Sequence, residues 1–135
     1  MAHPERDPSP AENAVVTKAL LRAADVLGLS QKELARAVGV SEATMSRIAA
    51  APARRRERAL QPSYVAVDRK EGELALLVLR VFRSLDALLG GDAQKVRAWF
   101  AAPNAHIGGV PKERIQTAEG LVMVAMYLDG MRGQL

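Results

Sequence analysis

The fold is decided by the stretch Leu29–Ile48, which reads LSQKELARAVGVSEATMSRI. Ser30 is followed three residues later by Glu33, and this spacing is typical of a capping box at the start of a helix. Gly39 tolerates the left-handed backbone that ends a helix. The sequence therefore predicts a short helix over Gln31–Val38, bounded at both ends.

A second short helix follows the glycine. Ser41 is a good N-cap, and the pattern predicts a helix over about Glu42–Ala50. Two short helices that cross steeply need a small residue where they approach, and Ala35 supplies it. The arrangement resembles the Xre-type, phage-repressor-like helix-turn-helix. The apolar residues predicted to form its core are Leu34, Val38, Val40, Met45 and Ile48.

The outer face of this motif is a candidate for DNA binding. In a DNA-binding helix-turn-helix the second of the two helices enters the major groove, where an arginine such as Arg47 contacts a guanine edge. A structural or dimerising role for the unit stays open, because the face has few cations and Glu42 repels phosphate. The predicted DNA-binding residues are Gln31, Lys32, Ser41, Thr44, Ser46 and Arg47, with Arg54, Arg55 and Arg56 from the basic flank as phosphate contacts.

The rest of the chain is also predicted to be helical. Apolar residues recur at helical spacing before Leu29–Ile48, over about residues 12–27, and four further helical stretches follow a Pro-containing basic linker at 51–62. No strand is predicted, so the fold class is all-α. The predicted organisation is a tail at 1–11, a helix-turn-helix domain with its basic flank at 12–60, and a helical domain at 61–135. The four later helices are expected at about 70–89, 93–101, 112–115 and 117–131. The apolar residues expected to anchor the last of them are Leu121, Val122, Val124, Ala125 and Leu128.

Composition excludes several classes of function. The 135 residues contain no Cys and only two His, which excludes disulfides, zinc fingers and thiol catalysis and offers no metal site. No clustered acid–base or nucleophilic constellation is present, so the chain is predicted to be no enzyme and to need no cofactor. No signal peptide or membrane-spanning stretch is visible, which favours a cytoplasmic protein. The net charge of +4 permits a nucleic-acid partner.

A second motif lies in the C-terminal half. Leu88-Leu89-Gly90-Gly91 is followed by Val96, Trp99-Phe100, Pro103-Asn104 and Ile107-Gly108-Gly109, and then by Pro111, Ile115, Thr117, Glu119-Gly120 and Leu128. The order and spacing of these residues resemble the toxin-binding domain of the Xre/MbcA/ParS antitoxin family, over about Leu74–Leu128. One departure is Val110, where the family pattern often has a polar cap before the proline.

The resemblance implies a function. Members of that family are antitoxins of type II toxin–antitoxin modules, and their usual partner is a RES-domain toxin that degrades NAD⁺. The antitoxin covers the active site of the toxin, and its helix-turn-helix often represses its own operon. The NAD⁺ chemistry belongs to the partner, and the chain has no dinucleotide-binding glycine motif of its own.

Residues for contact with a toxin are expected in the loop Asn104–Gly109 and at the end of the last helix, where exposed side chains of interface-forming types occur. The predicted residues are Asn104, His106, Ile107, Tyr127, Met131, Arg132 and Leu135. Met123 and Met126 are either an adaptable apolar face or ordinary core, whereas Trp99 is expected in the core.

Homodimerisation is expected because a single small helix-turn-helix buries little DNA surface. The apolar run Leu74–Phe82 fits either a dimer interface or an internal core. Two alternatives to an antitoxin remain open from the sequence, namely a stand-alone transcriptional repressor and a protein-interaction adaptor that does not bind DNA.

Overall fold

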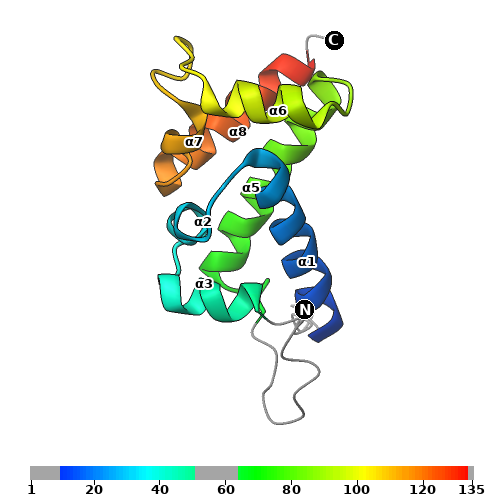
Figure 1. Cartoon of the computed structure of the whole chain (residues 1–135), viewed down its shortest axis with the longest axis vertical. Helices are drawn as coiled ribbons and strands as arrows, with labels where there is room; N and C mark the ends of the chain where they lie inside the picture. The colour runs from blue at the N-terminus through cyan, green and yellow to red at the C-terminus, as the bar shows by residue number, and fades with distance from the viewer. Residues whose placement is uncertain (1–9, 51–63, 134–135) are drawn as a thin grey trace, which may run out of the picture.

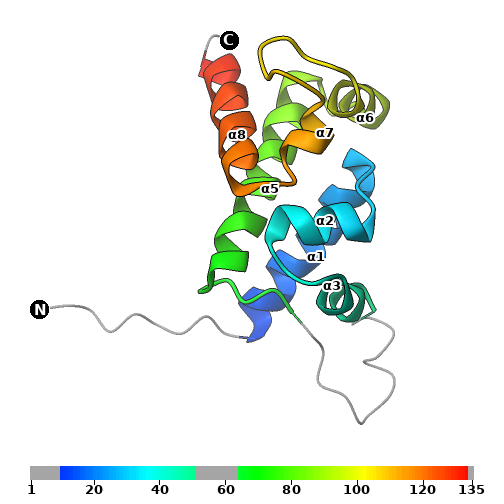
Figure 2. The same cartoon turned by 90° about the vertical axis from the view of Figure 1, so that its left-hand side faces the viewer.

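A computed structural model describes residues 10–50 and 64–133 of the chain. The described residues form helices with no strand, which confirms the all-α fold class. Figures 1 and 2 show a long central helix, α5, with the other helices arranged around it. The helices are α1 (Pro10–Leu27), α2 (Gln31–Val38), α3 (Glu42–Ala49), α5 (Lys70–Leu88), α6 (Ala93–Ala101), α7 (Pro111–Arg114) and α8 (Ala118–Gly133).

The first three helices form the predicted helix-turn-helix unit. α2 has the predicted bounds, and α3 ends one residue earlier than expected. α1 begins at Pro10, two residues before the predicted start, in keeping with the preference for proline in the first turn of a helix. The predicted core is confirmed, because Leu34, Val38, Met45 and Ile48 are buried and Val40 packs against them.

The chain returns to α1 before it enters α5. The backbone N–H of Val65 donates to the Thr17 hydroxyl (3.0 Å), and the N–H of Val67 donates to the Asn13 side-chain oxygen (3.1 Å). Val65 is itself buried in the core. These bonds fix where α5 starts, so α5 lies against α1 from its first turn.

α5 joins the two halves of the molecule. It packs against α1 and α2 on one side and against α8 on the other. Ala75, Val78 and Val81 are completely buried, whereas Leu76 is exposed. The apolar run Leu74–Phe82 is therefore mostly internal core, and one exposed leucine remains from it on the surface.

The last three helices meet at close range. Asp92 caps α6 through the N–H groups of Gln94 and Lys95, as its position predicts. The short helix α7 starts at Pro111 without a side-chain cap from Val110, as the departure at that position implies. Gly120 of α8 lies against the carbonyl oxygen of Arg114, where a Cβ atom would stand only 1.8 Å from that oxygen.

One continuous core runs through both halves. Buried residues of α1, α2, α3 and α5 belong to the same cluster as Phe100 of α6 and Leu121 of α8. Trp99 packs against this cluster, as expected. Val122 was expected to anchor the last helix, and that prediction is wrong, because its side chain is 41% exposed. The predicted linker at 51–62, and with it the domain boundary at residue 60, lies outside the described residues.

Candidate DNA- and protein-binding surfaces

Capping interactions fix the geometry of α2. The N–H of Glu33 donates to the Ser30 hydroxyl (3.1 Å), and the Glu33 carboxylate accepts from the N–H of Ser30 (2.9 Å). The predicted capping box is therefore present. At the other end Gly39 has φ +80°, a left-handed backbone conformation that residues other than glycine rarely adopt. The turn after Gly39 sets the direction in which α3 leaves.

α3 presents the predicted polar face to solvent. The Ser41 hydroxyl accepts the N–H of Thr44 (3.1 Å) and donates to the Thr44 hydroxyl (2.9 Å), so Ser41 caps the helix as expected. Arg47 donates from Nη2 to the same Thr44 hydroxyl (3.1 Å). Ser41, Ser46 and Arg47 are exposed and Thr44 is partly exposed. The structure thus brings the predicted α3 residues together on one accessible surface.

The start of α2 borders this surface. Gln31 and Lys32 are both exposed, and the Lys32 ammonium lies 4.0 Å from the Glu42 carboxylate at the start of α3. An exposed pair at that distance contributes little stability. This weak pair leaves Lys32 available to contact a phosphate, although the Glu42 carboxylate beside it would repel that phosphate. The other predicted phosphate contacts, Arg54, Arg55 and Arg56, lie outside the described residues.

A tight loop lies at the opposite end of the molecule. The carbonyl oxygen of Asn104 accepts from the N–H groups of Ile107, Gly108 and Gly109, and its side-chain oxygen accepts from the N–H of His106 (2.9 Å). Arg114 also donates to the Gly108 carbonyl (3.1 Å). The Pro-Asn and Gly-Gly pairs noted in the sequence therefore build one hydrogen-bonded turn with a fixed shape.

The loop carries one side chain outward and another inward. The His106 ring stacks on Tyr127 of α8, with ring centroids 5.8 Å apart and planes 18° from parallel. Ile107 was predicted to be an exposed contact residue, and that expectation is wrong, because it is only 2% exposed. Burial of Ile107 anchors the loop in the core, while His106 and Tyr127 remain at the surface.

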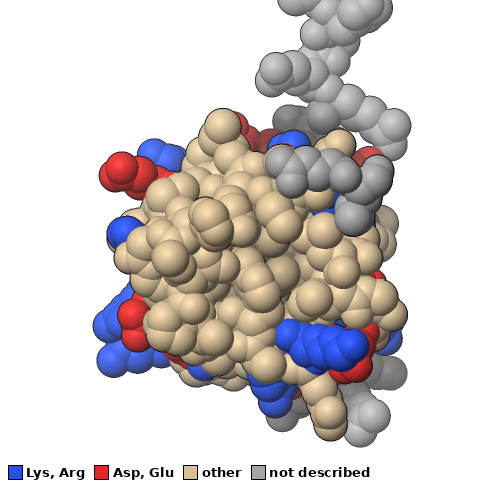
Figure 3. Space-filling model, turned by 90° about the horizontal axis from the view of Figure 1, so that it is seen from above, with Lys and Arg blue, Asp and Glu red and all other residues tan. Residues whose placement is uncertain are grey.

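α8 has an apolar exterior as well as an apolar core side. Met123 and Met126 are exposed, which settles the question left open by the sequence in favour of a surface position. Met131 and Arg132 are also exposed, whereas Leu135 lies outside the described residues. Figure 3, which looks onto the end formed by α6, the loop and the end of α8, shows a broad uncharged surface with charged residues at its edge. Met131 adds an exposed apolar side chain at this end of α8, and exposed apolar side chains that gather on one surface mark interaction sites.

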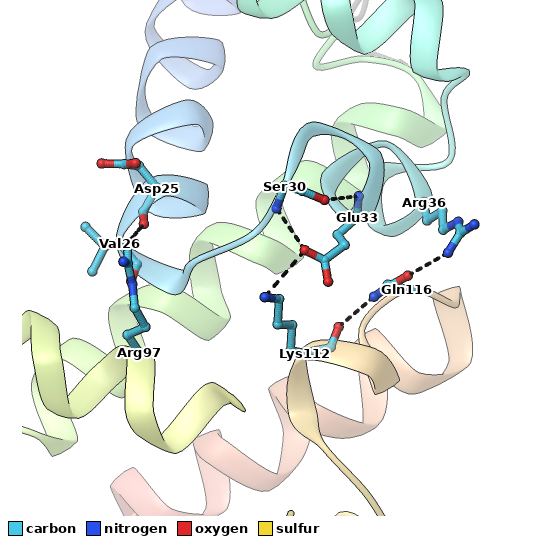
Figure 4. A network of polar contacts seen from close by, with 8 residues as sticks. All are labelled: Asp25, Val26, Ser30, Glu33, Arg36, Arg97, Lys112 and Gln116. Atoms are coloured by element: carbon cyan, nitrogen blue, oxygen red, sulfur yellow. Dashed lines mark hydrogen bonds and ion pairs between the residues drawn. The ribbon is translucent and has the colours of Figure 1, made fainter. Parts of the chain in front are cut away.

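A polar network ties the helix-turn-helix to the C-terminal helices (Figure 4). The Lys112 ammonium of α7 lies 3.5 Å from the Glu33 carboxylate of the capping box. Arg36 of α2 donates to the Gln116 side chain (3.3 Å), which in turn donates to the Lys112 carbonyl (3.2 Å). Burial raises the pKa of Glu33, but the hydrogen bonds from Ser30 and the charge of Lys112 outweigh it and hold that pKa below its usual value.

A second contact between the halves involves the end of α1. Arg97 of α6 donates from Nε to the Val26 carbonyl (3.3 Å) and from Nη2 to the Asp25 carbonyl. These carbonyls belong to the last turn of α1, and that of Asp25 also accepts the N–H of Gly28 (3.1 Å). No sequence signal identified Arg97 or Lys112, because their partners are 71 and 79 residues away along the chain.

Two negative observations apply to residues 10–50 and 64–133. No group of three or more His, Cys, Asp or Glu in these ranges is placed to hold a metal ion. None of the helices in them is long and apolar enough to cross a membrane.

Comparison with known families agrees with the geometry. The family model described as the antitoxin Xre-like helix-turn-helix domain matches residues 8–80, more than half of the chain. The model described as the antitoxin Xre/MbcA/ParS C-terminal toxin-binding domain matches residues 84–133. No curated protein matches the sequence. The first match ends inside α5, and the second covers the loop and the whole of α8, so the resemblance predicted from the sequence is confirmed.

Proposed function

The chain belongs to the Xre/MbcA/ParS antitoxin family, and from that premise we propose that it neutralises a RES-domain toxin that degrades NAD⁺. It does so by covering the toxin's active site. The reaction with NAD⁺ belongs to the toxin, and this chain acts as a binding protein without a cofactor. Operon DNA and NAD⁺ are both met in the cytoplasm, where we propose that it works.

The observation that carries this proposal is the surface formed by the 104–109 loop and α8. His106 and Tyr127 are stacked, and Met131 lies one turn beyond Tyr127 on the same side of α8. Aromatic and methionine side chains are enriched at the centres of protein interfaces. This surface lies wholly within the range that matches the toxin-binding domain.

Repression of its own operon is the second part of the proposal. It is supported by the exposed α3 face with Arg47 and by the match to the Xre-like helix-turn-helix. Repressors of this architecture bind as dimers, because two recognition helices reach two half-sites of a palindrome. We therefore propose that two copies of the chain act together on operator DNA.

Co-expression with the neighbouring reading frame tests the antitoxin function. The wild-type chain is expected to restore growth and NAD⁺ levels in cells that express the toxin, and to co-purify with it. Met131→Glu places a charge in the proposed contact and is expected to abolish rescue, while Lys95→Glu on the exposed side of α6 is the matched charge control.

The outcomes separate the candidate functions. If neither rescue nor a stable complex occurs with the wild-type chain while the upstream promoter fragment is still bound, the chain is a stand-alone repressor. If a complex forms without rescue and without any binding to the promoter, it is an adaptor, whereas rescue without promoter binding leaves the antitoxin function and removes only the repression. Rescue by Met131→Glu equal to that by the wild-type chain would remove the loop surface from the proposal.

A further inference from the structure

The 104–109 loop has a fixed shape, but its internal hydrogen bonds do not set where it stands relative to α8. Those bonds all involve Asn104, whose backbone and side-chain oxygens accept N–H groups of the loop and whose own N–H donates to a loop carbonyl. Burial of Ile107 holds the loop against the core, although apolar packing is non-directional. Tyr127, on which the His106 ring stacks, belongs to α8. A further contact is therefore needed to fix the loop against that helix.

Arg114, the last residue of α7, makes such a contact. Its Nη2 donates to the Gly108 carbonyl oxygen (3.1 Å). Between the loop and the helices that follow it, this is the one side-chain hydrogen bond in the part of the chain that the structure describes. A Cβ atom at Gly108 would stand only 2.8 Å from Nη2, and one at Gly109 would stand 3.5 Å from Nε. The guanidinium therefore packs directly against the backbone of the two glycines.

The backbone of the same residue contacts the start of α8. The Arg114 carbonyl oxygen lies so close to Gly120 that a Cβ atom there would stand 1.8 Å from it. The Thr117 hydroxyl donates to that carbonyl at long range (3.5 Å) and accepts the N–H of Gly120 (3.1 Å). Arg114 therefore touches the loop with its side chain and α8 with its backbone, six residues after Gly108 and six residues before Gly120.

These contacts form a closed circuit. Tyr127 follows Gly120 by seven residues, which is about two turns of α8. The ring of Tyr127 stacks on His106, which stands two residues before Gly108. The circuit runs from Arg114 through the loop to the two rings and back along α8. Breaking one contact of a closed circuit lets its parts move relative to one another, so the geometry of the ring pair depends on Arg114.

We propose that Arg114 is a positioning residue for toxin binding, which holds the stacked pair of His106 and Tyr127 in the orientation that the toxin meets. It acts on the toxin through His106. The gain is entropic, because a loop and side chains that are ordered before binding do not have to be ordered during it. This role rests on the proposed function, since the loop and α8 form the proposed toxin surface.

Proton NMR of the free chain tests the positioning without the toxin. The chain has two histidines, His3 and His106, so the ring signals of one serve as reference for the other. The ring current of Tyr127 shifts the signals of a histidine stacked on it, and Tyr127→Leu gives their unstacked positions. Arg114→Met is expected to move the His106 signals toward those positions. Lys95→Met, on the exposed side of α6, is the matched control and is expected to leave them unchanged.

A double-mutant cycle tests the link to the toxin, with the purified product of the neighbouring reading frame as the probe. Arg114→Met is expected to weaken the complex by about tenfold. The double variant Arg114→Met/His106→Ala is expected to bind no more weakly than His106→Ala alone, because nothing is left to position. Arg114→Lys keeps a donor for the Gly108 carbonyl and is expected to lose less than Arg114→Met in both measurements. Surface plasmon resonance gives the dissociation constants.

Thermal unfolding separates positioning from stability. The Arg114 side chain is exposed, so Arg114→Met is expected to leave the unfolding midpoint close to that of Lys95→Met. A midpoint that falls in step with the affinity would make the role of Arg114 merely structural and overturn the proposal.

Two further outcomes overturn it. His106 signals that do not move in Arg114→Met would show that the ring pair does not depend on the arginine. Losses of affinity that add in the double variant would show that Arg114 contacts the toxin itself. Additive losses with a wild-type chain that binds the toxin reject only this role, whereas a wild-type chain that does not bind the toxin rejects the proposed function.

Discussion

At the scale of single residues, Glu33 does more than the sequence pattern indicates. Its carboxylate closes the capping box with Ser30 and also pairs with Lys112, which belongs to the C-terminal half. The side chains of Glu33 and Lys112 are only 24% and 28% exposed, so solvent screens the pair less than it screens a fully exposed one. One carboxylate therefore holds the start of α2 and the contact between the two halves.

The lowered pKa of Glu33 makes this contribution depend on pH. The stabilisation is present above the usual value of 4.5 and is lost as the pH falls through the lower folded pKa. Glu33→Gln keeps an acceptor for Ser30 but removes the charge. We expect it to lower the free energy of unfolding by about 0.5–1 kcal/mol at pH 7. Urea unfolding at a series of pH values from pH 7 downward measures the difference, and a difference that does not shrink as the pH falls would contradict the ionic explanation.

Arg47 carries the clearest prediction for DNA. It is exposed at the end of α3, and among the residues that the structure describes its guanidinium is held only by the Thr44 hydroxyl. Arg47→Ala is expected to weaken binding to the upstream promoter fragment by about 1–3 kcal/mol. Lys95→Ala on α6 serves as the control. Fluorescence anisotropy at two salt concentrations measures both, and no salt-dependent binding by the wild-type chain would exclude the repressor role.

At the scale of helices, α8 is the element that combines packing and recognition. Leu121, Val124 and Leu128 point into the core, while one flank carries Tyr127 and the other carries Val122. A helix that is apolar on several sides is expected to be covered on several sides. α8 therefore packs against the core and also contributes to the proposed toxin surface.

Two glycines of α8 test how tightly this helix is seated. Gly120→Ala would place a Cβ atom 1.8 Å from the Arg114 carbonyl oxygen, a backbone atom that cannot simply move aside. We expect a loss of stability of about 3 kcal/mol or more. Gly130→Ala is the matched control, because nothing lies within 4 Å and alanine favours the helix by roughly 0.5–1 kcal/mol. Thermal unfolding distinguishes them, and equal midpoints would show that α8 is not seated on Arg114.

At the scale of the whole molecule, the two regions of the chain that the family models match share one hydrophobic core. α5 buries side chains against α1 and α2 and against α8, so neither half keeps its packing without this helix. The Glu33–Lys112 and Arg97–Val26 contacts add polar links between the halves. The chain is therefore expected to unfold as one cooperative unit.

Trp99 is a natural probe for that cooperativity. It is the single tryptophan and lies on α6, in the C-terminal half. Leu34→Ala opens a cavity in the core under α2 and is expected to cost about 2–5 kcal/mol. The free energy of unfolding obtained from the Trp99 fluorescence transition should fall by the same amount. Lys32→Ala, exposed on the same helix, should leave it unchanged. A Trp99 transition that ignores Leu34→Ala would mean that the halves unfold independently.

The sequence predicted the elements well and the surfaces only in part. Capping residues and glycine turns gave α2 and α6 their bounds, because these signals are local. Val122 was expected to be buried and is exposed, because a helix that is apolar on all sides has no polar face to show which residues point outward. Ile107 was expected to be exposed and is buried, because a short loop has no periodic pattern to show which residue points inward. The positions of Arg97 and Lys112 depend on how distant helices pack.

By itself, the sequence determined the helices, the helix-turn-helix and the family, because caps, turn glycines and apolar spacing act between residues a few positions apart. Only the tertiary structure decided which apolar side chains stay outside. It buried Ile107, left Met126 and Leu76 exposed, and gathered three arginines from α5 and α8 at one groove. The physical reason is that a side of a helix is exposed only where no other helix packs against it. Which helices pack together depends on contacts across the whole chain.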